Sequence, residues 1–485
     1  MNGYKKEPLV YLWGNTSALI NIEAVMNYTV LDDILAAKGE LVIYVGDDCY
    51  YVTLGKKAIL DEKKKYGDMF LGQACFDEHI LKMDKLFKWR EGLIEEVNSA
   101  DLSKYSNLNL FELAKKYHEI SGRVFGHMVI SRPECVDHLS EKLISLLSKQ
   151  NKNENEVNKQ FAVLVSPIEL DIIKKEQIAR LELLENISEE NLKKHVLNFP
   201  WLYGYKYTAE DAVSDLKNDL TKDSKESLLQ TINSFKTELS KIEKEKNEIL
   251  KEYSNNEIDL LTERLSFLGH NRLEIKSRFA GLQVTVSPLF KEIAQRGGIE
   301  LKEMLDNYLL KDLEKLLVNG IKLSEKEITE RKRVVFYTKG EEIISIQGEK
   351  AEEFAKEYLH EYLNDEKSYV KGMTASRGFA VGKVRKMILN DEIKLDSFEE
   401  GEILITEMTA PNMIPIMKRC GGIITNEGGI VSHAAIISRE FGIPCIVGTS
   451  TATQVFETGD YVELDANKGT ARKISEEEFN DTKIN

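Results

Sequence analysis

The sequence predicts a multidomain protein, with a mostly α-helical domain that carries a small β-rich part at its N-terminus, followed by a C-terminal domain built from both strands and helices. Three observations predict this organisation. Residues 1–60 contain short β-rich runs, residues 76–330 place apolar side chains three and four apart, and 12 of the 30 glycines lie between residues 372 and 469. A chain of 485 residues is long enough for two or three domains with large cores.

The β-rich part begins the chain. Residues 9–13 (LVYLW) and 41–45 (LVIYV) have the β-branched and aromatic content that is typical of strands. Gly46, Asp47 and Asp48 follow the second run, and they fit either a metal-binding loop or a hairpin turn. We favour the turn, because Gly and Asp are common in turns on backbone grounds alone.

Residues 76–330 are expected to be helical. Within them, residues 205–258 repeat apolar positions at spacings of four and three amid Lys and Glu, which predicts a coiled-coil-like arm. The arm either binds a partner or packs within the chain, and packing is the default interpretation. His118, His127 and His138 lack the spacing of paired metal ligands, so a packed or surface role is expected for each.

Arg272 and Lys276 lie four residues apart, which places both on one face of a helix. Two such cations repel each other slightly unless an anion lies between them. Spacing alone leaves two interpretations open, a solvated face with Glu274 as a weak partner or a site for an anionic group.

Composition limits the classes of function. The chain has 66 basic and 81 acidic residues and a net charge of −15, which argues against a nucleic-acid or anionic-membrane surface. Its five cysteines form no C-x-x-C pair, so we expect free thiols in a reducing cytoplasm and no metal site. We also expect no secretory signal and no membrane-spanning segment.

The domain boundaries follow from composition. We expect the helical domain over residues 1–345, a polar linker over 346–371, a C-terminal domain over 372–475 and a tail over 476–485. The glycine content of the C-terminal domain indicates short strands and tight turns. A polar stretch of about nine residues within this linker spans at most about 30 Å when extended, which permits a domain to swing.

The most informative stretch of the chain is TNEGGIVSHAAIISREFGIP, residues 425–444. A Gly428-Gly429 turn precedes Ser432 and His433, and a run of helix formers then stops at Gly442. His433 should therefore lie on the first turn of a helix, where unpaired backbone N–H groups and the helix dipole favour an anion. Taken alone, a histidine at a helix start is more often a cap or a surface residue.

This stretch resembles the phosphohistidine, or swivelling, domain of the phosphoenolpyruvate-utilising enzymes, which include phosphoenolpyruvate synthase, pyruvate phosphate dikinase and rifampicin phosphotransferase. The resemblance rests on Gly428, Gly429, Ser432, Ala434, Ala435, Gly442, Pro444 and Gly448, and it continues through residues 372–384, 401–411 and 459–469. It implies a β/β/α swivelling fold in which His433 carries a phosphoryl group, with Gly428, Gly429 and Ser432 around the phosphate. Val431 and Asn426 depart from the family pattern. Val431 removes a regulatory hydroxyl next to the histidine.

The R-x-x-x-K pair, Arg272 and Lys276, resembles the acceptor-substrate domain of rifampicin-phosphotransferase-like proteins. The resemblance implies that both side chains face the acceptor and the incoming phosphohistidine. Cations suit phosphoryl transfer because they neutralise charge on the phosphoryl oxygens.

The sequence shows neither a Walker loop nor a segment of the kind that an ATP-grasp domain requires. The expected function is therefore a phosphotransferase component that works with a separate ATP-grasp-type kinase subunit, which holds ATP and Mg²⁺, and with a small-molecule acceptor. We expect no cofactor and no metal on this chain, and no nucleic-acid or membrane partner. The alternative is a non-catalytic relic of the family that binds a ligand or a partner protein.

Overall fold

The computed structural model divides into two compact units, which are described separately. The helical unit comprises residues 1–7, 15–50 and 55–352, and the C-terminal unit comprises residues 8–14, 51–54 and 353–485. The structure describes the chain except for residues 1–8, 16–18, 32–40, 47–48, 56–64, 68, 131–132, 151–152, 205, 222–223, 340–341, 359–367, 388–397, 410–412, 430–431, 450 and 485. Most of the chain is helical, and a mixed sheet lies in its C-terminal part, as predicted.

The first residues form strands, but they also form a helix. β1 (Leu9–Asn15), β2 (Leu41–Gly46) and β3 (Cys49–Gly55) join β4 (Val334–Lys339) and β5 (Glu342–Gln347) in a sheet of order β1-β3-β2-β4-β5. β2 and β3 are neighbours in the sheet, while Asp47 and Asp48 lie outside the described residues.

The expectation of only strands and turns over residues 1–60 is wrong, because α1 (Leu19–Leu31) lies between β1 and β2. Residues 19–26 are buried on all sides, so no amphipathic period marks the helix in the sequence. It packs against α4 (Asn107–Ile130), where Tyr117 donates a hydrogen bond to Asn21. Tertiary packing therefore selects the helix here.

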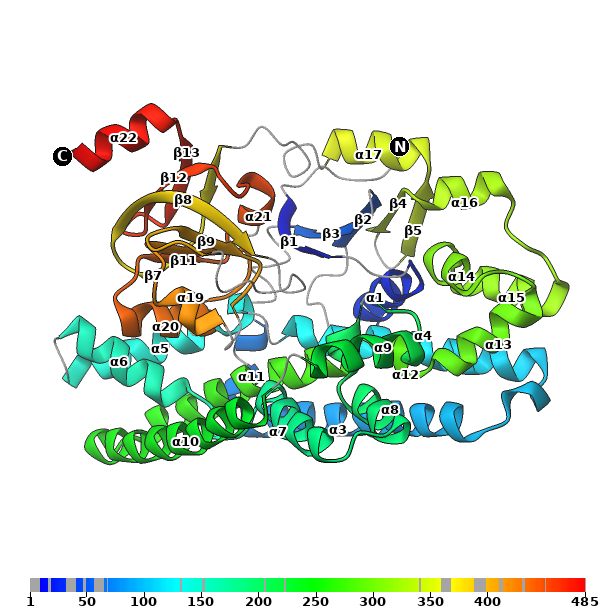
Figure 1. Cartoon of the computed structure of the whole chain (residues 1–485), viewed down its shortest axis with the longest axis horizontal. Helices are drawn as coiled ribbons and strands as arrows, with labels where there is room; N and C mark the ends of the chain where they lie inside the picture. Colours follow the sequence, from blue (N-terminus) through cyan, green and yellow to red (C-terminus); the bar gives the residue numbers. More distant parts are fainter. Residues whose placement is uncertain are drawn as a thin grey trace. The chain divides into compact units, whose positions relative to one another are not determined.

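The expected helical region is confirmed. α3 begins at Gln73 and α16 ends at Arg331, and Figure 1 shows the helices between them packed side by side. Besides α4, these are α3 (Gln73–Ser99), η1 (Leu102–Lys104), α5 (Pro133–Gln150), α6 (Glu154–Val165), α7 (Ile172–Glu185), α8 (Glu189–Asn198), η2 (Pro200–Tyr203), α9 (Ala209–Leu220), α10 (Lys225–Tyr253), α11 (Asn256–Phe279), α12 (Leu282–Thr285), α13 (Ser287–Gly297), α14 (Leu301–Asn307), α15 (Leu310–Asn319) and α16 (Glu325–Arg331).

The segment expected to form a coiled-coil-like arm, residues 205–258, is divided between helices. α9 packs against α8, and its apolar face belongs to a compact core cluster. α10 lies along α7 and α6, where Phe235 and Tyr253 are buried (Figure 1). The Tyr253 hydroxyl donates a 2.7 Å hydrogen bond to Oε1 of Gln160. The apolar stripe of α10 is thus covered within the chain, which was the default interpretation.

The C-terminal unit is built on a mixed sheet of order β6-β13-β12-β8-β9-β10-β11-β7. β8, β9, β10 and β11 run parallel to one another. The elements are β6 (Tyr369–Lys371), β7 (Met373–Ser376), β8 (Phe379–Met387), β9 (Ile403–Thr406), α19 (Ile414–Met417), β10 (Gly422–Thr425), α20 (His433–Phe441), β11 (Cys445–Val447), α21 (Ala452–Val455), β12 (Tyr461–Asp465), β13 (Thr470–Ile474) and α22 (Glu476–Ile484).

Both faces of this sheet are covered. Ile423 lies in the apolar cluster that contains residues of α19 and α20, whereas Ile424 lies in the cluster that contains residues of α21. Because side chains alternate across a strand, the continuous apolar run of β10 serves both layers.

Regular structure extends into the expected linker and tail. α17 (Glu349–Tyr358) lies within residues 346–371, and it buries Ala351, Phe354 and Ala355 at helical spacing. Residues 359–367 lie outside the described residues. The expected tail contains α22.

Candidate functional site

Helix α20 begins at the carboxyl end of β10, the strand between β9 and β11. All four residues of β10 are buried, and Thr425 ends the strand. In parallel sheets the loops that follow the carboxyl ends of the strands are the usual ligand sites. The β10–α20 loop therefore occupies a position suited to binding.

The backbone shape of this loop explains why it contains glycine. Gly428 has a φ of +118°, which side chains other than glycine rarely adopt, and a Cβ built there would lie 2.9 Å from Oγ of Ser432. The backbone N–H of Ser432 donates to the carbonyl oxygen of Gly429 at 2.9 Å. The turn thus holds Ser432 directly against the start of the helix.

Neighbouring segments fix the beginning of the loop. The Asn426 side chain donates to Oγ1 of Thr453 at 2.5 Å and accepts from the Thr453 backbone N–H at 3.0 Å. The Thr449 hydroxyl donates to the Thr425 carbonyl oxygen at 3.0 Å. Asn426, which departs from the family pattern, therefore anchors the loop to α21.

Ser432 is the N-cap of α20, and its Oγ accepts a hydrogen bond from the Ala435 backbone N–H at 3.3 Å. His433 is the first residue of the helix, which agrees with its predicted place on the first turn. The remaining first-turn amides lack partners within the helix, and the helix dipole adds positive potential there. The side chain of His433 lies outside the described residues, so its role stays a prediction.

The other end of α20 is also fixed. Gly442, with a φ of +67°, ends the helix, and the Ile443 N–H donates to the Ser438 carbonyl oxygen at 2.8 Å. Arg439 donates from Nη1 to the Ala375 carbonyl oxygen on β7 at 3.3 Å, and burial lowers the pKa of its guanidinium. The helix is held at both ends, which gives the loop a rigid support.

The second candidate site lies on α11, in the helical unit. Arg272 and Lys276 are both half-buried and lie one turn apart on this helix, as their spacing predicts. At about 100° per residue, His270 and Glu274 lie on the opposite side of the helix.

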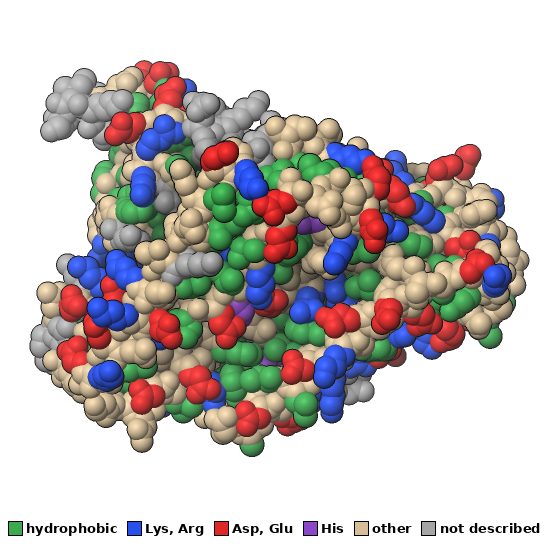
Figure 2. Space-filling view, turned by 60° about the horizontal axis from the view of Figure 1, so that its bottom comes forward, with side chains coloured by type: hydrophobic (Ala, Val, Ile, Leu, Met, Phe, Trp, Pro, Cys, Tyr) green, Lys and Arg blue, Asp and Glu red, His purple; other side chains and the backbone are tan. Residues whose placement is uncertain are grey.

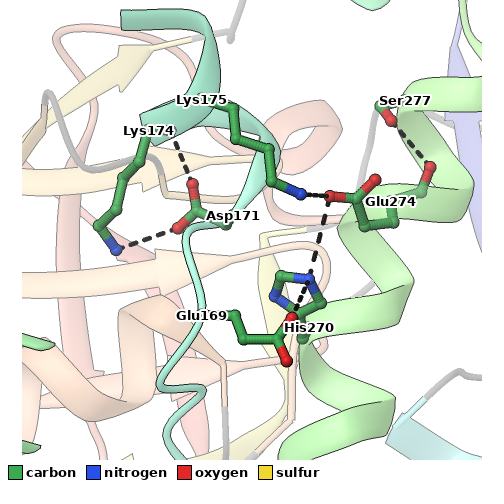
Figure 3. Close-up of polar contacts among 7 residues, drawn as sticks. All are labelled: Glu169, Asp171, Lys174, Lys175, His270, Glu274 and Ser277. Atoms are coloured by element: carbon green, nitrogen blue, oxygen red, sulfur yellow. Dashed lines mark hydrogen bonds and ion pairs between the residues drawn. The ribbon is translucent and has the colours of Figure 1, made fainter. Parts of the chain in front are cut away.

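The polar residues on that opposite side connect α11 to α7. Figure 3 shows Lys175 reaching Glu274 at 2.5 Å, while His270 lies 3.9 Å from Glu274 and 3.7 Å from Glu169. Glu274 is thus paired with Lys175 of α7, on the side of α11 away from Arg272 and Lys276. This cluster ties two helices together.

Histidines of the helical unit occupy packed positions. His118 is fully buried, and its Nε2 lies 3.2 Å from Oε2 of Glu23, an oxygen that also accepts the Leu310 N–H at 2.7 Å. His127 is buried next to His79, with ring centroids 5.2 Å apart. The packed role expected for His118 and His127 agrees with this burial. No pattern in the sequence singles out His79, because the two rings come from different helices.

A groove of about 590 Å³ lies between α3 and α4, which is within the usual range for small-molecule sites. Neither Arg272 nor Lys276 is among its lining residues. These are Trp89, Glu96, Tyr105, Asn109, Glu112, Leu113, Lys115, Lys116 and Glu119. Within the described part of the chain, no group of three or more His, Cys, Asp or Glu side chains could hold a metal ion.

Comparisons with known proteins identify the C-terminal unit. Residues 398–469, which include the β10–α20 loop, match the family model "PEP-utilising enzyme, mobile domain". These residues of the C-terminal unit are therefore similar to the mobile domain of the phosphoenolpyruvate-utilising enzymes.

Similar proteins agree with this assignment. A probable phosphoenolpyruvate synthase of Methanothermobacter thermautotrophicus is 52% identical over 100 residues, which is 21% of this chain and 14% of that protein. The phosphoenolpyruvate synthase of Pyrococcus furiosus is 49% identical over 104 residues, 21% of this chain and 12% of that protein. The chain therefore spans only a small part of the length of these relatives.

One relative matches over a longer stretch. An uncharacterized phosphotransferase of Bacillus subtilis is 32% identical over 190 residues, 38% of this chain and 22% of that protein. This is more than the chain holds after residue 372, so part of the match precedes the mobile domain. Among solved structures, the holo-form of aconitase X from Thermococcus kodakaraensis aligns at 16% identity over 22% of this chain and 98% of that chain, with a TM-score of 0.18. Among the described helices, none has the length and apolar character needed to cross a bilayer.

Proposed function

We propose that this chain is a phosphotransferase component in which His433 carries a phosphoryl group. A separate ATP-grasp-type subunit, with ATP and Mg²⁺, would donate the group, and a small molecule bound to the helical unit would accept it. The observation that carries the proposal is the position of His433 as the first residue of α20, next to its N-cap Ser432 and within the mobile-domain match. The phosphotransferase and synthase names of the relatives support the reaction class.

The chemistry of charging follows from the helix start. A neutral imidazole nitrogen of His433 attacks phosphorus, an N–P bond forms, and the P–O bond to the donor's leaving group breaks. The first-turn amides and the helix dipole stabilise the negative phosphoryl oxygens. Because protonated imidazole has no lone pair to attack with, charging should fail at low pH.

Discharge requires an acceptor and cations. An acceptor oxygen attacks phosphorus, the N–P bond breaks, and the acceptor proton passes to solvent. Arg272 and Lys276, one turn apart on α11, are suited to neutralise charge on the transferring group. We place the reaction in the cytoplasm, in keeping with the free thiols of Cys75, Cys420 and Cys445.

Labelling of the intact chain tests the carrier role. The protein is incubated with a candidate ATP-grasp subunit, ATP and Mg²⁺, and in parallel with phosphoramidate, a small donor that needs no partner subunit. Intact-mass spectrometry before and after acid treatment then detects an acid-labile phosphoryl group. We expect labelling of the wild type and of His270→Asn, and none of His433→Asn. Equal labelling of His433→Asn would remove the assignment.

A second experiment tests the acceptor half. Arg272→Gln and Lys276→Gln should leave the charging of His433 intact but slow its discharge to added acceptors. Lys302→Gln serves as the control, because Lys302 is an exposed lysine that pairs with Asp306 and lies over the ring of Tyr207. A folded wild-type chain that neither donor labels would instead support the non-catalytic alternative.

A further inference from the structure

Two buried histidines face each other in the helical unit. His79 on α3 and His127 on α4 are 5% and 9% exposed, and their rings are tilted by 54° with centroids 5.2 Å apart. Nε2 of His79 and Nδ1 of His127 have no hydrogen-bond partner among the described residues. Buried polar atoms are almost always paired in proteins, so two unpaired nitrogens at one place indicate a bound molecule that completes them.

Both imidazoles are neutral in the empty protein. Burial, and then the charge of Lys82, lower the pKa of His79 to about 4. Burial lowers the pKa of His127 to about 3, with further contributions from His79, Lys82 and Arg123. Each ring therefore offers one N–H donor and one lone pair. The ring of Phe70 packs edge-on against His79 at 5.4 Å and closes one side of the pair.

The surrounding charges select the kind of ligand. The side chains whose charges act on the pair are cationic, Lys82 on α3 and Arg123 on α4. On α11, Arg264 reaches the same aromatic cluster, with its guanidinium carbon 3.8 Å from the Phe76 ring centroid and its Nε unpaired. Each cation also has a carboxylate partner. These pairs are Lys82 with Glu78, Arg123 with Glu119 and Arg264 with Glu263.

A metal cation would meet repulsion at this place, and the described residues supply no third His, Cys, Asp or Glu ligand. An anionic oxygen group, by contrast, accepts hydrogen bonds from the imidazoles and is attracted by the cations. We propose that the His79–His127 pair is an anion-binding site for a phosphate or carboxylate group of a small molecule. Figure 2 shows histidine side chains at the surface in a few small patches. His127 keeps 9% of its surface exposed.

Binding should be coupled to proton uptake. An anion that accepts hydrogen bonds from both rings stabilises the imidazolium form, so the pKa values of His79 and His127 rise when the site is filled. The complex then holds more protons than the empty protein, and affinity increases as the pH falls. Sulfate is the suitable probe, because it stays an anion over the whole pH range in which the two histidines titrate.

The test follows the imidazole ring signals of the intact chain by NMR during a sulfate titration, with phosphate and acetate in parallel. We expect sulfate to shift the signals of both rings and raise their pKa values, and affinity to fall at least tenfold in His79→Gln and in His127→Gln. His195→Gln is the matched control, because His195 is also buried but lies 3.0 Å from its partner Glu176. Acetate binding as tight as sulfate binding would assign the site to carboxylate groups. Binding of sulfate and phosphate without binding of acetate would assign it to phosphate groups.

The proposal is overturned if none of the three anions shifts the two rings of the wild type, a measurement that needs no variant to fold. It is also overturned if binding persists undiminished in both folded histidine variants. The site is independent of the proposed phosphoryl transfer, so His433→Asn should bind sulfate like the wild type. Loss of His433 labelling and loss of sulfate binding can therefore be told apart.

Discussion

Replacing Gly428 with alanine tests whether the shape of the β10–α20 loop supports the start of α20. Alanine at a φ of +118° is strained by about 1–3 kcal/mol. The new Cβ would lie 2.9 Å from Oγ and 3.0 Å from Cβ of Ser432, so the cap must move. Losing an N-cap costs about 1 kcal/mol more, which gives a total of roughly 2–4 kcal/mol for the C-terminal unit.

Urea denaturation with hydrogen exchange of the α20 amides measures this cost locally. Labelling by phosphoramidate measures the functional consequence, because a displaced Ser432 changes the amides next to His433. We expect Gly428→Ala to expose the first turn of α20 to exchange and to lose most of its labelling.

Gly442→Ala is the matched control at the other end of the same helix. Its φ of +67° also disfavours alanine, by about 1 kcal/mol, but nothing lies within 4 Å of the new Cβ. This variant should lose stability and keep its labelling. Gly428→Ala with wild-type exchange and wild-type labelling would refute the reasoning, as would an equal loss of labelling in Gly442→Ala.

Three further predictions concern Ser432, Asp312 and His79. Ser432→Asp should keep the N-cap and the stability of α20 but reduce labelling of the first turn by phosphoramidate, because the added negative charge repels the phosphoryl group. Asp312→Ala should cost about 3–5 kcal/mol in urea denaturation, because it leaves Arg331 buried without the oxygen 2.7 Å away. His79 has a folded pKa of about 4, below its ordinary value of 6.5, so the unfolded chain binds more protons between these values. Stability should therefore be lost as the pH falls from about 6.5 towards 4, by about 3 kcal/mol, and the loss should be smaller in His79→Gln.

Controls separate these effects from general damage. Ser432→Thr should keep both the cap and the labelling, so its failure would show that charge is not the cause. Lys326→Ala breaks an exposed pair with Glu330 at 3.8 Å and should change stability by less than about 1 kcal/mol. A pH dependence that is the same in the wild type and in His79→Gln would contradict the assignment of that loss to His79.

Much of the C-terminal unit could be predicted from the sequence. The glycines of the β10–α20 loop, the N-cap Ser432 and the stop at Gly442 are local signals, because each reports a backbone conformation within a few residues. The helical region from α3 to α16 was likewise readable from apolar spacing. Arg272 and Lys276 were placed on one helix, but spacing could not tell which neighbours they meet.

Other features depend on contacts between distant residues. α1 was missed because residues 19–26 are buried on every side and so carry no helical period. The predicted arm was divided because α10 finds its apolar partners on α6 and α7, far away in the sequence. α17, which lies within the expected linker, is a short helix. A helix of this length is stable only when its apolar side chains are packed against the rest of the protein.

The sequence by itself therefore determined the secondary structure of the His433 helix and the family of the C-terminal unit. Short-range steric and hydrogen-bonding rules are enough for that. Only the tertiary structure brought residues 41–46 beside residues 334–339 in one sheet and set His79 against His127. Those pairings arise from burial of surfaces that are separate along the chain, and no local pattern encodes which surfaces will meet.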